Sequence, residues 1–210
     1  MKIALDIDGV LLDFDTHWRT FAIAHLEREL PKLNSDYDLG TRYGVTKKES
    51  DSVWAAFYDQ EKWASILPYP CALESVPRLH DSHHDLFCVT AAPEDVETQR
   101  RISLQALELE DKLIEFTGYH HEGNTKHEAL SRHQPDVFVD DQLINLLHAQ
   151  ESGINHRIWI DRGDAQMHVK NAQDWSEIAT LKITTLNSLP TAIERIDKIH
   201  RKNGSNFKVA

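Results

Sequence analysis

Asp-Ile-Asp-Gly-Val-Leu-Leu-Asp-Phe, residues 6–14, is the stretch that decides the fold of this chain. It follows an apolar run at residues 3–5 (Ile-Ala-Leu), which predicts a buried first strand. Asp6 and Asp8 are two positions apart at the end of that strand, so their side chains point the same way. Gly9 then allows a sharp turn without the steric cost of a Cβ atom. One carboxylate can attack or bind a metal while the other handles a proton, so the stretch predicts a reaction centre.

Short apolar runs recur along the chain and predict the buried strands of a parallel sheet. They are Ile3–Ile7, Leu86–Val89, Leu113–Phe116, Val137–Val139 and Ile158–Ile160, with Ile183–Leu186 as a candidate sixth strand. Helical patterns lie between the later runs, at Pro93–Leu109, Thr125–His133 (with Thr125 as N-cap) and Gln142–Ser152. This alternation predicts right-handed crossovers and therefore a doubly wound, Rossmann-like α/β sheet.

One interval, from Asp15 to about Leu67, breaks the alternation of strands and helices. It contains helical patterns at residues 18–30 and 50–63, separated by a polar stretch at residues 34–44, and no run typical of a strand. We interpret it as a small helical cap inserted after the first strand. The predicted division is an α/β core of residues 1–14 and 68–210 and a cap of residues 15–67.

Composition limits the partners that this protein can have. The chain has 210 residues and a net charge of −11, which argues against a nucleic-acid polymer as the partner. Cys71 and Cys88 lack CxxC spacing, and we interpret both as buried thiols of an intracellular protein. No apolar run reaches the length of a membrane span, and Met1 and Lys2 lead directly into the first strand. We therefore expect a soluble, cytoplasmic protein without a membrane partner; a homodimer is left open.

Two polar positions outside the opening stretch could hold an anion. Thr90 follows a predicted strand, where its hydroxyl and the next backbone N–H groups suit phosphate oxygens, although such a threonine is often only an N-cap. Lys126 falls in the first turn of a predicted helix, where an exposed cation opposes the helix dipole unless an anion needs it there. A solvated charge is the alternative for Lys126, and Arg101 and Lys112 are rival cations.

Asp140 and Asp141 follow another predicted strand. Adjacent carboxylates repel each other unless a cation joins them, and hard oxygen ligands from two strand ends suit Mg²⁺. A capping role for one of them is compatible with metal binding. The 13 histidines raise the alternative of zinc, but the pairs at 83–84 and 120–121 lack ligand spacing and have no cysteine partner. We interpret these histidines as surface side chains.

The order Asp-x-Asp-Gly, strand-Thr, Lys and Asp-Asp, from Asp6 to Asp141, resembles the four motifs of the haloacid dehalogenase (HAD) superfamily of phosphotransferases. The predicted insertion also lies where that superfamily has its helical cap. Within it, Asp-x-Asp-Gly-Val-Leu-x-Asp-Phe and the stretch Trp63–Ala72 are similar to the 5′(3′)-deoxyribonucleotidase branch. The resemblance implies a Mg²⁺-dependent phosphomonoesterase that hydrolyses a small phosphate monoester, with a (deoxy)nucleoside monophosphate as the expected substrate.

The same resemblance implies a role for each motif residue. Asp6 would be the nucleophile that forms an aspartyl-phosphate. Asp8 would protonate the leaving oxygen and then activate the hydrolytic water. Thr90, the backbone N–H of Ala91 and Lys126 would hold the phosphoryl oxygens.

The metal and the nucleoside also have implied positions. Mg²⁺ would be held by Asp6, the backbone carbonyl of Asp8, and Asp140 or Asp141. Phe14 falls where the nucleotidases place a ring against the nucleoside. The cap would add further aromatic side chains, which form either its core or a stacking platform: Trp18, Trp54, Phe57, Tyr58 and Trp63.

Two departures from the nucleotidase pattern fall near the expected substrate. Ala91 stands where that branch has Ser, and Gln142 stands where relatives often carry Arg. They leave the phosphatase prediction intact but weaken the substrate prediction. A HAD phosphatase of a sugar phosphate or another small metabolite is therefore one alternative, and an inactive binding or regulatory module of the same fold is another.

Overall fold

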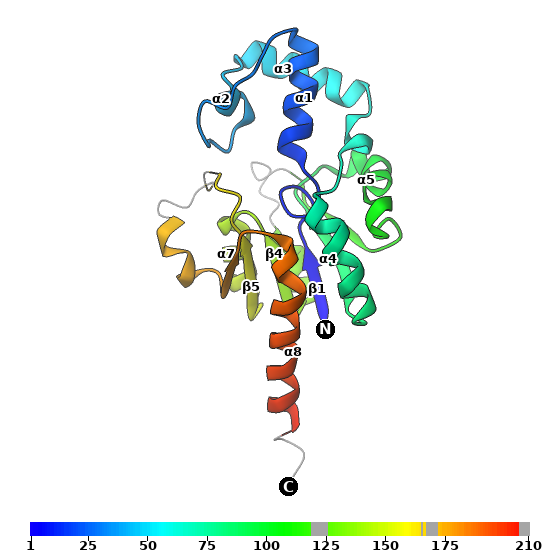
Figure 1. Cartoon of the computed structure of the whole chain (residues 1–210), viewed down its shortest axis with the longest axis vertical. Helices are drawn as coiled ribbons and strands as arrows, with labels where there is room; N and C mark the ends of the chain where they lie inside the picture. The colour runs from blue at the N-terminus through cyan, green and yellow to red at the C-terminus, as the bar shows by residue number, and fades with distance from the viewer. Residues whose placement is uncertain (119–125, 165, 167–171, 206–210) are drawn as a thin grey trace.

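At the centre of the molecule lies a sheet of six parallel strands in the spatial order β3-β2-β1-β4-β5-β6 (Figure 1). The strands are β1 (Lys2–Leu5), β2 (Asp85–Thr90), β3 (Ile114–Phe116), β4 (Val137–Asp140), β5 (His156–Ile160) and β6 (Leu181–Ile183). The structure is a computed structural model and describes residues 1–118, 126–164, 166 and 172–205. It confirms the predicted doubly wound sheet. The sixth strand was predicted at Ile183–Leu186, but β6 ends at Ile183. Leu186 is the first residue of a 3₁₀ helix.

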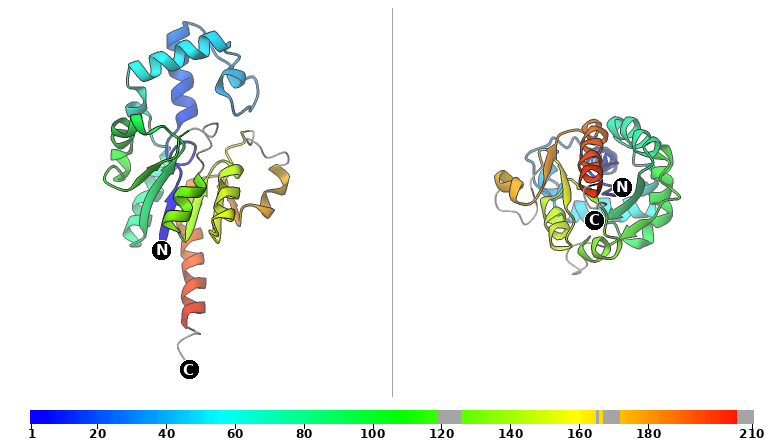
Figure 2. Two further views of the ribbon diagram at one scale, coloured as in Figure 1. Left: turned by 180° about the vertical axis from the view of Figure 1, so that it is seen from behind. Right: turned by 90° about the horizontal axis from the view of Figure 1, so that it is seen from below.

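Helices cover both faces of the sheet, because side chains alternate between the faces along each strand. Ile3 and Leu5 belong to one cluster of buried residues, and Ala4 belongs to another. The first cluster includes residues of α4 (Pro70–Asp81), α5 (Glu97–Leu104) and α8 (Leu189–Ser205), and the second includes residues of α6 (Lys126–His133) and α7 (Leu143–Glu151). Figures 1 and 2 show these two layers from opposite sides.

The register of the central strands brings the predicted chemical groups to one edge of the sheet. Leu5 lies beside Cys88 of β2 and Val139 of β4. The backbone N–H of Asp6 donates to the carbonyl of Val139 at 2.9 Å. Because the strands are parallel, Asp6 and the residues that end β2 and β4 meet at their carboxyl ends, where open α/β sheets bind ligands.

A helical segment lies beyond the carboxyl ends of the strands, at the top of Figure 1. It consists of α1 (Phe14–Leu26), α2 (Leu39–Tyr43), α3 (Lys47–Asp59) and the 3₁₀ helix η1 (Lys62–Ser65). α1 and α3 begin earlier than the predicted helices because capping side chains lie upstream. Asp13 accepts a backbone hydrogen bond at 3.2 Å, and Thr46 and Glu49 form a capping box. The division into separate core and cap domains stays a prediction.

The predicted helix at residues 93–109 is wrong as one continuous helix. The segment forms η2 (Glu94–Val96), α5 and η3 (Gln105–Leu107) in succession. Leu107 and Leu109 are both buried, and in one continuous α-helix these two residues would face nearly opposite directions. Burying both therefore requires the chain to leave the helical path.

Two helices of the core, α4 and α8, were not predicted. Pro77 in the interior of α4 argues against a helix, yet α4 buries Ala72, Val76 and Leu79, while Pro70 lies in its first turn, where proline is accepted. The remaining 3₁₀ helices are η5 (Ala172–Glu177) and η6 (Leu186–Ser188). None of the described helices combines the length and the apolar character that crossing a membrane requires.

The two cysteines do not share one environment. Cys88 is buried in β2, as predicted, whereas Cys71 is only partly buried, and both are free thiols. The predicted N-cap of α6, Thr125, lies outside the described residues.

Candidate active site

A buried lysine joins two carboxylates at the carboxyl end of the sheet. Nζ of Lys126, at the start of α6, lies 2.7 Å from Oδ1 of Asp6 and 2.7 Å from Oδ2 of Asp140. Its side chain is 1% exposed. The alternative of a solvated charge is therefore wrong, because two carboxylates of the protein itself hold Lys126.

The pairing keeps Lys126 charged in spite of its burial. Burial alone lowers the pKa of Lys126, but the carboxylates of Asp140 and Asp6 outweigh it and raise the pKa above its ordinary value. For Asp6, the effect of burial on the pKa outweighs that of the paired charge. Burial raises the pKa of Asp6 well above its ordinary value, Lys126 opposes this, and Asp140 and Asp141 add to it.

Asp6, Asp140 and Asp141 form an acidic cluster in which one carboxylate oxygen from each lies within 4.8 Å of the others. Burial raises the pKa of Asp141 to about 7, and the charge of Asp140 contributes further. Asp140 is held by Lys126 and by the side chain of Asn145, which donates at 3.0 Å. Asp141, in contrast, lines the cavity described below. The hard oxygens and their mutual repulsion fit a divalent cation such as Mg²⁺.

Gly9 allows the loop after β1 to approach this cluster. Its φ is +78°, and a Cβ atom at this position would lie 2.6 Å from Cγ of Asp141. Any side chain here would be strained and would push against Asp141. The close approach explains why Gly follows Asp8.

The strand-end Thr90 and the next residue, Ala91, line the same cavity as Asp6 and Asp8. Oγ1 of Thr90 accepts a hydrogen bond from the backbone N–H of Ala92 at 3.2 Å. The hydroxyl therefore helps to shape the turn after β2, but Thr90 is not a helix N-cap, because the next helix, η2, has Pro93 at that position. Its place in the cavity is also compatible with binding an anion.

The cavity has a volume of about 320 Å³, and one of its walls is aromatic. The ring of Phe14 stacks on Trp63, with centroids 5.3 Å apart and planes at 16°, and on Trp54 at 6.0 Å and 21°. All three residues line the cavity. Of the other predicted cap aromatics, Trp18 and Phe57 are fully buried in the hydrophobic core, so the set is divided between core and cavity.

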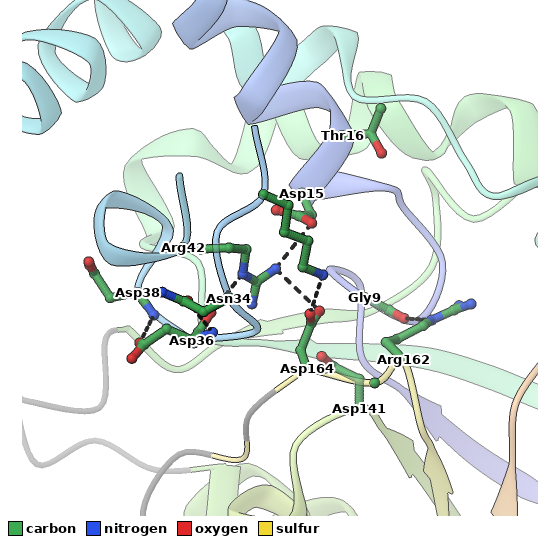
Figure 3. A network of polar contacts seen from close by, with 12 residues as sticks. Gly9, Asp15, Thr16, Asn34, Asp36, Asp38, Arg42, Asp141, Arg162 and Asp164 are labelled. Carbon is green, nitrogen blue, oxygen red and sulfur yellow. Dashed lines mark hydrogen bonds and ion pairs between the residues drawn. The ribbon is translucent and has the colours of Figure 1, made fainter. Parts of the chain in front are cut away.

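Another part of the cavity lining, the charged wall of Asp15, Arg42 and Asp164, joins the helical segment to the loop after β5 (Figure 3). Arg42, which is nearly buried, lies 3.1 Å from Asp15 and 3.2 Å from Asp164. Lys32 adds a second ion pair to Asp164 at 2.9 Å. The two ion pairs of Asp164 connect residues more than a hundred positions apart in the sequence.

Arg162 ties the loop after β5 to the loop of the two aspartates. Its Nε donates to the carbonyl of Gly9 at 2.6 Å (Figure 3). Its guanidinium lies 4.0 Å from the ring centroid of Tyr69. Arg162 and Asp164 follow a strand at its carboxyl end, a signal that could have identified them from the sequence. Arg42 lies in a polar stretch and carried no such signal.

Asp8 lines the cavity, and Nη2 of Arg100 in α5 donates a hydrogen bond to its Oδ2. Arg100 was not predicted. Its neighbour Arg101, one of the rival cations, pairs instead with Glu97 at 2.6 Å and does not line the cavity. The other rival, Lys112, does not line it either.

The zinc alternative finds no support in the part of the chain that the structure describes. There, the acidic cluster is the one group of three or more His, Cys, Asp or Glu side chains that could hold a metal. His83 and His84 are not part of it, and His120 and His121 lie outside the described residues.

Comparison with known proteins places the fold. A conserved haloacid dehalogenase-like protein of unknown function from Agrobacterium tumefaciens superposes with a TM-score of 0.61 and 12% identity, over 93% of this chain and 98% of that one. A HAD family hydrolase from Deinococcus radiodurans, with bound phosphate and sodium, superposes with a TM-score of 0.60 and 13% identity, over 92% of this chain and 95% of that one. The L-2-haloacid dehalogenase from Xanthobacter autotrophicus superposes with a TM-score of 0.54 and 10% identity, over 92% of this chain and 98% of that one. The chain has the fold of these HAD-type proteins, so the fold that the motif resemblance implies is confirmed.

Sequence comparison is less extensive. No protein-family model matches the chain. A Bacillus cereus protein named "Putative nucleotidase" is 27% identical over 100 residues, which is 45% of this chain. The match spans about half of that relative's length (52%).

Proposed function

We propose that this protein is a Mg²⁺-dependent phosphomonoesterase that hydrolyses a (deoxy)nucleoside monophosphate through an aspartyl-phosphate on Asp6. The observation that carries the proposal is that Asp6 lines a cavity, where it pairs with the buried Lys126 and lies close to Asp141. This arrangement offers a nucleophile, a cation for phosphoryl oxygens and a metal site within one pocket. The phosphate bound to the Deinococcus hydrolase of the same fold is consistent with it.

The acidic cluster is the site that would hold the metal. Asp6 and Asp141, with Asp140 and the backbone carbonyl of Asp8 as further ligands, supply the hard oxygens that Mg²⁺ prefers. Burial, and after it the charge of Asp140, raises the pKa of Asp141, and a bound cation would favour the ionised carboxylate. Bound Mg²⁺ would offset the repulsion between these carboxylates and a phosphate dianion.

The proposed reaction has two displacements at phosphorus. In the first, a carboxylate oxygen of Asp6 bonds to phosphorus while the ester P–O bond breaks; the leaving oxygen takes the electron pair of that bond and a proton from Asp8. In the second, water bonds to phosphorus and gives a proton to Asp8, while the bond to Asp6 breaks and inorganic phosphate leaves. Lys126, Thr90 and the N–H of Ala91 would hold the phosphoryl oxygens.

The aromatic wall is the feature that favours a nucleoside over other alcohols. Phe14, Trp54 and Trp63 present stacked rings to the cavity, and a planar base can pack against such a surface. The Bacillus cereus relative, named as a nucleotidase, agrees with this choice.

A sugar phosphate is the second candidate. The charged wall of Asp15, Arg42 and Asp164 offers hydrogen-bond acceptors and donors that suit several hydroxyl groups. A panel of deoxynucleoside and sugar monophosphates, assayed with Mg²⁺, separates the two. We expect kcat/KM to favour the nucleotides, and equal values for both classes would remove the case for a nucleotidase.

The nucleophile is tested by Asp6→Asn, with Asp59→Asn at an exposed position of α3 as the matched control. Asp6→Asn is expected to abolish hydrolysis of p-nitrophenyl phosphate while its circular dichroism spectrum stays that of the wild type. The control is expected to keep full activity. Retained turnover by Asp6→Asn would exclude Asp6 as the nucleophile. If the wild-type protein also failed to trap fluoroberyllate, the inactive binding module would become the better interpretation.

A further inference from the structure

Arg100 is a fully buried arginine that contacts Asp8 of the candidate active site. It lies on α5, it is 0% exposed, and it does not line the cavity. Burying a guanidinium is costly unless its donors are used, because the group loses its hydration. Its position therefore calls for a specific explanation.

The single side-chain hydrogen bond of Arg100 within the described residues goes to Asp8. Nη2 donates to Oδ2 of Asp8, whereas Nε and Nη1 have no hydrogen-bond partner among the described residues. In the same part of the chain, no other side chain bonds the carboxylate of Asp8. A purely structural arginine would be expected to satisfy more of its five donors. Here the guanidinium instead uses its one hydrogen bond on the carboxylate of Asp8.

The guanidinium of Arg100 also packs against the aromatic wall of the cavity. Its central carbon lies 4.3 Å from the ring centroid of Trp63, which stacks on Phe14 inside the cavity. A planar group can pack one face on a ring while its edge donates hydrogen bonds, which an ammonium cannot do. Trp63 thus packs against the guanidinium of Arg100, and this guanidinium holds one oxygen of Asp8.

We propose that Arg100 is a positioning residue that orients the carboxyl group of Asp8 for proton transfer to the leaving oxygen. The proposal rests on the proposed phosphatase function and adds a residue to it. The step that depends on orientation is the first displacement: the bond between Asp6 and phosphorus forms, the ester P–O bond breaks, and the proton of Asp8 moves to the leaving oxygen. Arg100 touches neither substrate nor phosphorus and acts only through Asp8.

The dependence of the rate on the leaving group tests this role. An alkoxide leaves poorly without a proton, whereas p-nitrophenolate is a stable anion that leaves without one. In Arg100→Gln we expect kcat/KM for an alkyl phosphate from the substrate panel to fall by about 100-fold, and that for p-nitrophenyl phosphate to fall less than about threefold. Arg101→Gln, one position along the same helix, is the matched control and should change neither value.

A general structural role predicts a different pattern. Loss of packing would lower kcat/KM for both substrates by the same factor, and this result would overturn the proposal, as would no loss for either substrate. If Arg100→Gln fails to fold, Arg100→Lys keeps the charge and a donor but not the planar face. Its loss should be smaller yet still confined to the alkyl phosphate, and a uniform loss in this variant would equally overturn the proposal.

The same assay separates this proposal from the proposed function. If the wild-type protein with Mg²⁺ hydrolyses neither class of phosphate, the phosphatase function fails and the role of Arg100 fails with it. If the wild type hydrolyses both and Arg100→Gln shows equal losses, only the role of Arg100 is excluded.

Discussion

Replacing Lys126 by Met removes the cation at the centre of the acidic cluster while keeping an unbranched side chain. The variant loses two ion pairs of 2.7 Å, to Asp6 and Asp140, from a position that is 1% exposed. Removing one partner of a buried pair leaves uncompensated charge and costs about 3–5 kcal/mol. For a chain of this size that corresponds to a fall in Tm of about 6–20 °C.

The loss should depend on pH. The pKa of Asp6 is already raised by burial, and Lys126 is the group that opposes the rise. A carboxyl whose folded pKa exceeds its unfolded value stabilises the fold below the unfolded pKa, and this contribution is lost as pH rises through the folded pKa. Without Lys126 that pKa rises further, so the variant should lose more stability at pH 8 than at pH 5.5.

Urea denaturation of the metal-free protein in EDTA, followed by circular dichroism at both pH values, measures the effect. Lys48→Met, at an exposed position of α3, is the matched control and should stay within about 0.5 kcal/mol of the wild type. A loss below about 1 kcal/mol at pH 8, or an equal loss at the two pH values, would refute the argument that Lys126 balances buried carboxylates.

Two further predictions concern the same cluster. Because burial raises the pKa of Asp141 to about 7 and also raises that of Asp6, the stability from these groups in the metal-free protein is present below about pH 4 and is lost as pH rises through 7. Added Mg²⁺ should therefore raise Tm more at pH 8 than at pH 5.5 in differential scanning fluorimetry; equal gains would contradict it. Gly9→Ala should weaken Mg²⁺ binding at least about tenfold by calorimetry, because its Cβ would meet Asp141 at 2.6 Å. Gly163→Ala has a similar φ of +77° but open space around it, so equal weakening in both variants would exclude the steric argument.

The core strands and the strand-end residues could be predicted from the sequence because their signals are local. A short apolar run predicts a buried strand, and parallel strands bring their carboxyl ends to one edge wherever the helices run. Asp6, Asp140 and Asp141 therefore cluster as expected, and Thr90 lines the same cavity as Asp6. The prediction of one continuous helix at residues 93–109 was wrong because a tertiary requirement overrides the local signal. The apolar residues there suit a helix, but burying both Leu107 and Leu109 in the core interrupts it.

The sequence by itself determined the parallel α/β sheet and the residues that gather at its edge, since strand periodicity and motif order are written in neighbouring residues. Only the tertiary structure decided how those residues are held. Arg100 is 92 positions from Asp8, and Arg162 is 153 positions from Gly9. The burial of Lys126 likewise depends on two carboxylates from different strands. Whether a charged side chain is solvated or buried in a pair depends on what the fold places beside it, and no local pattern carries that information.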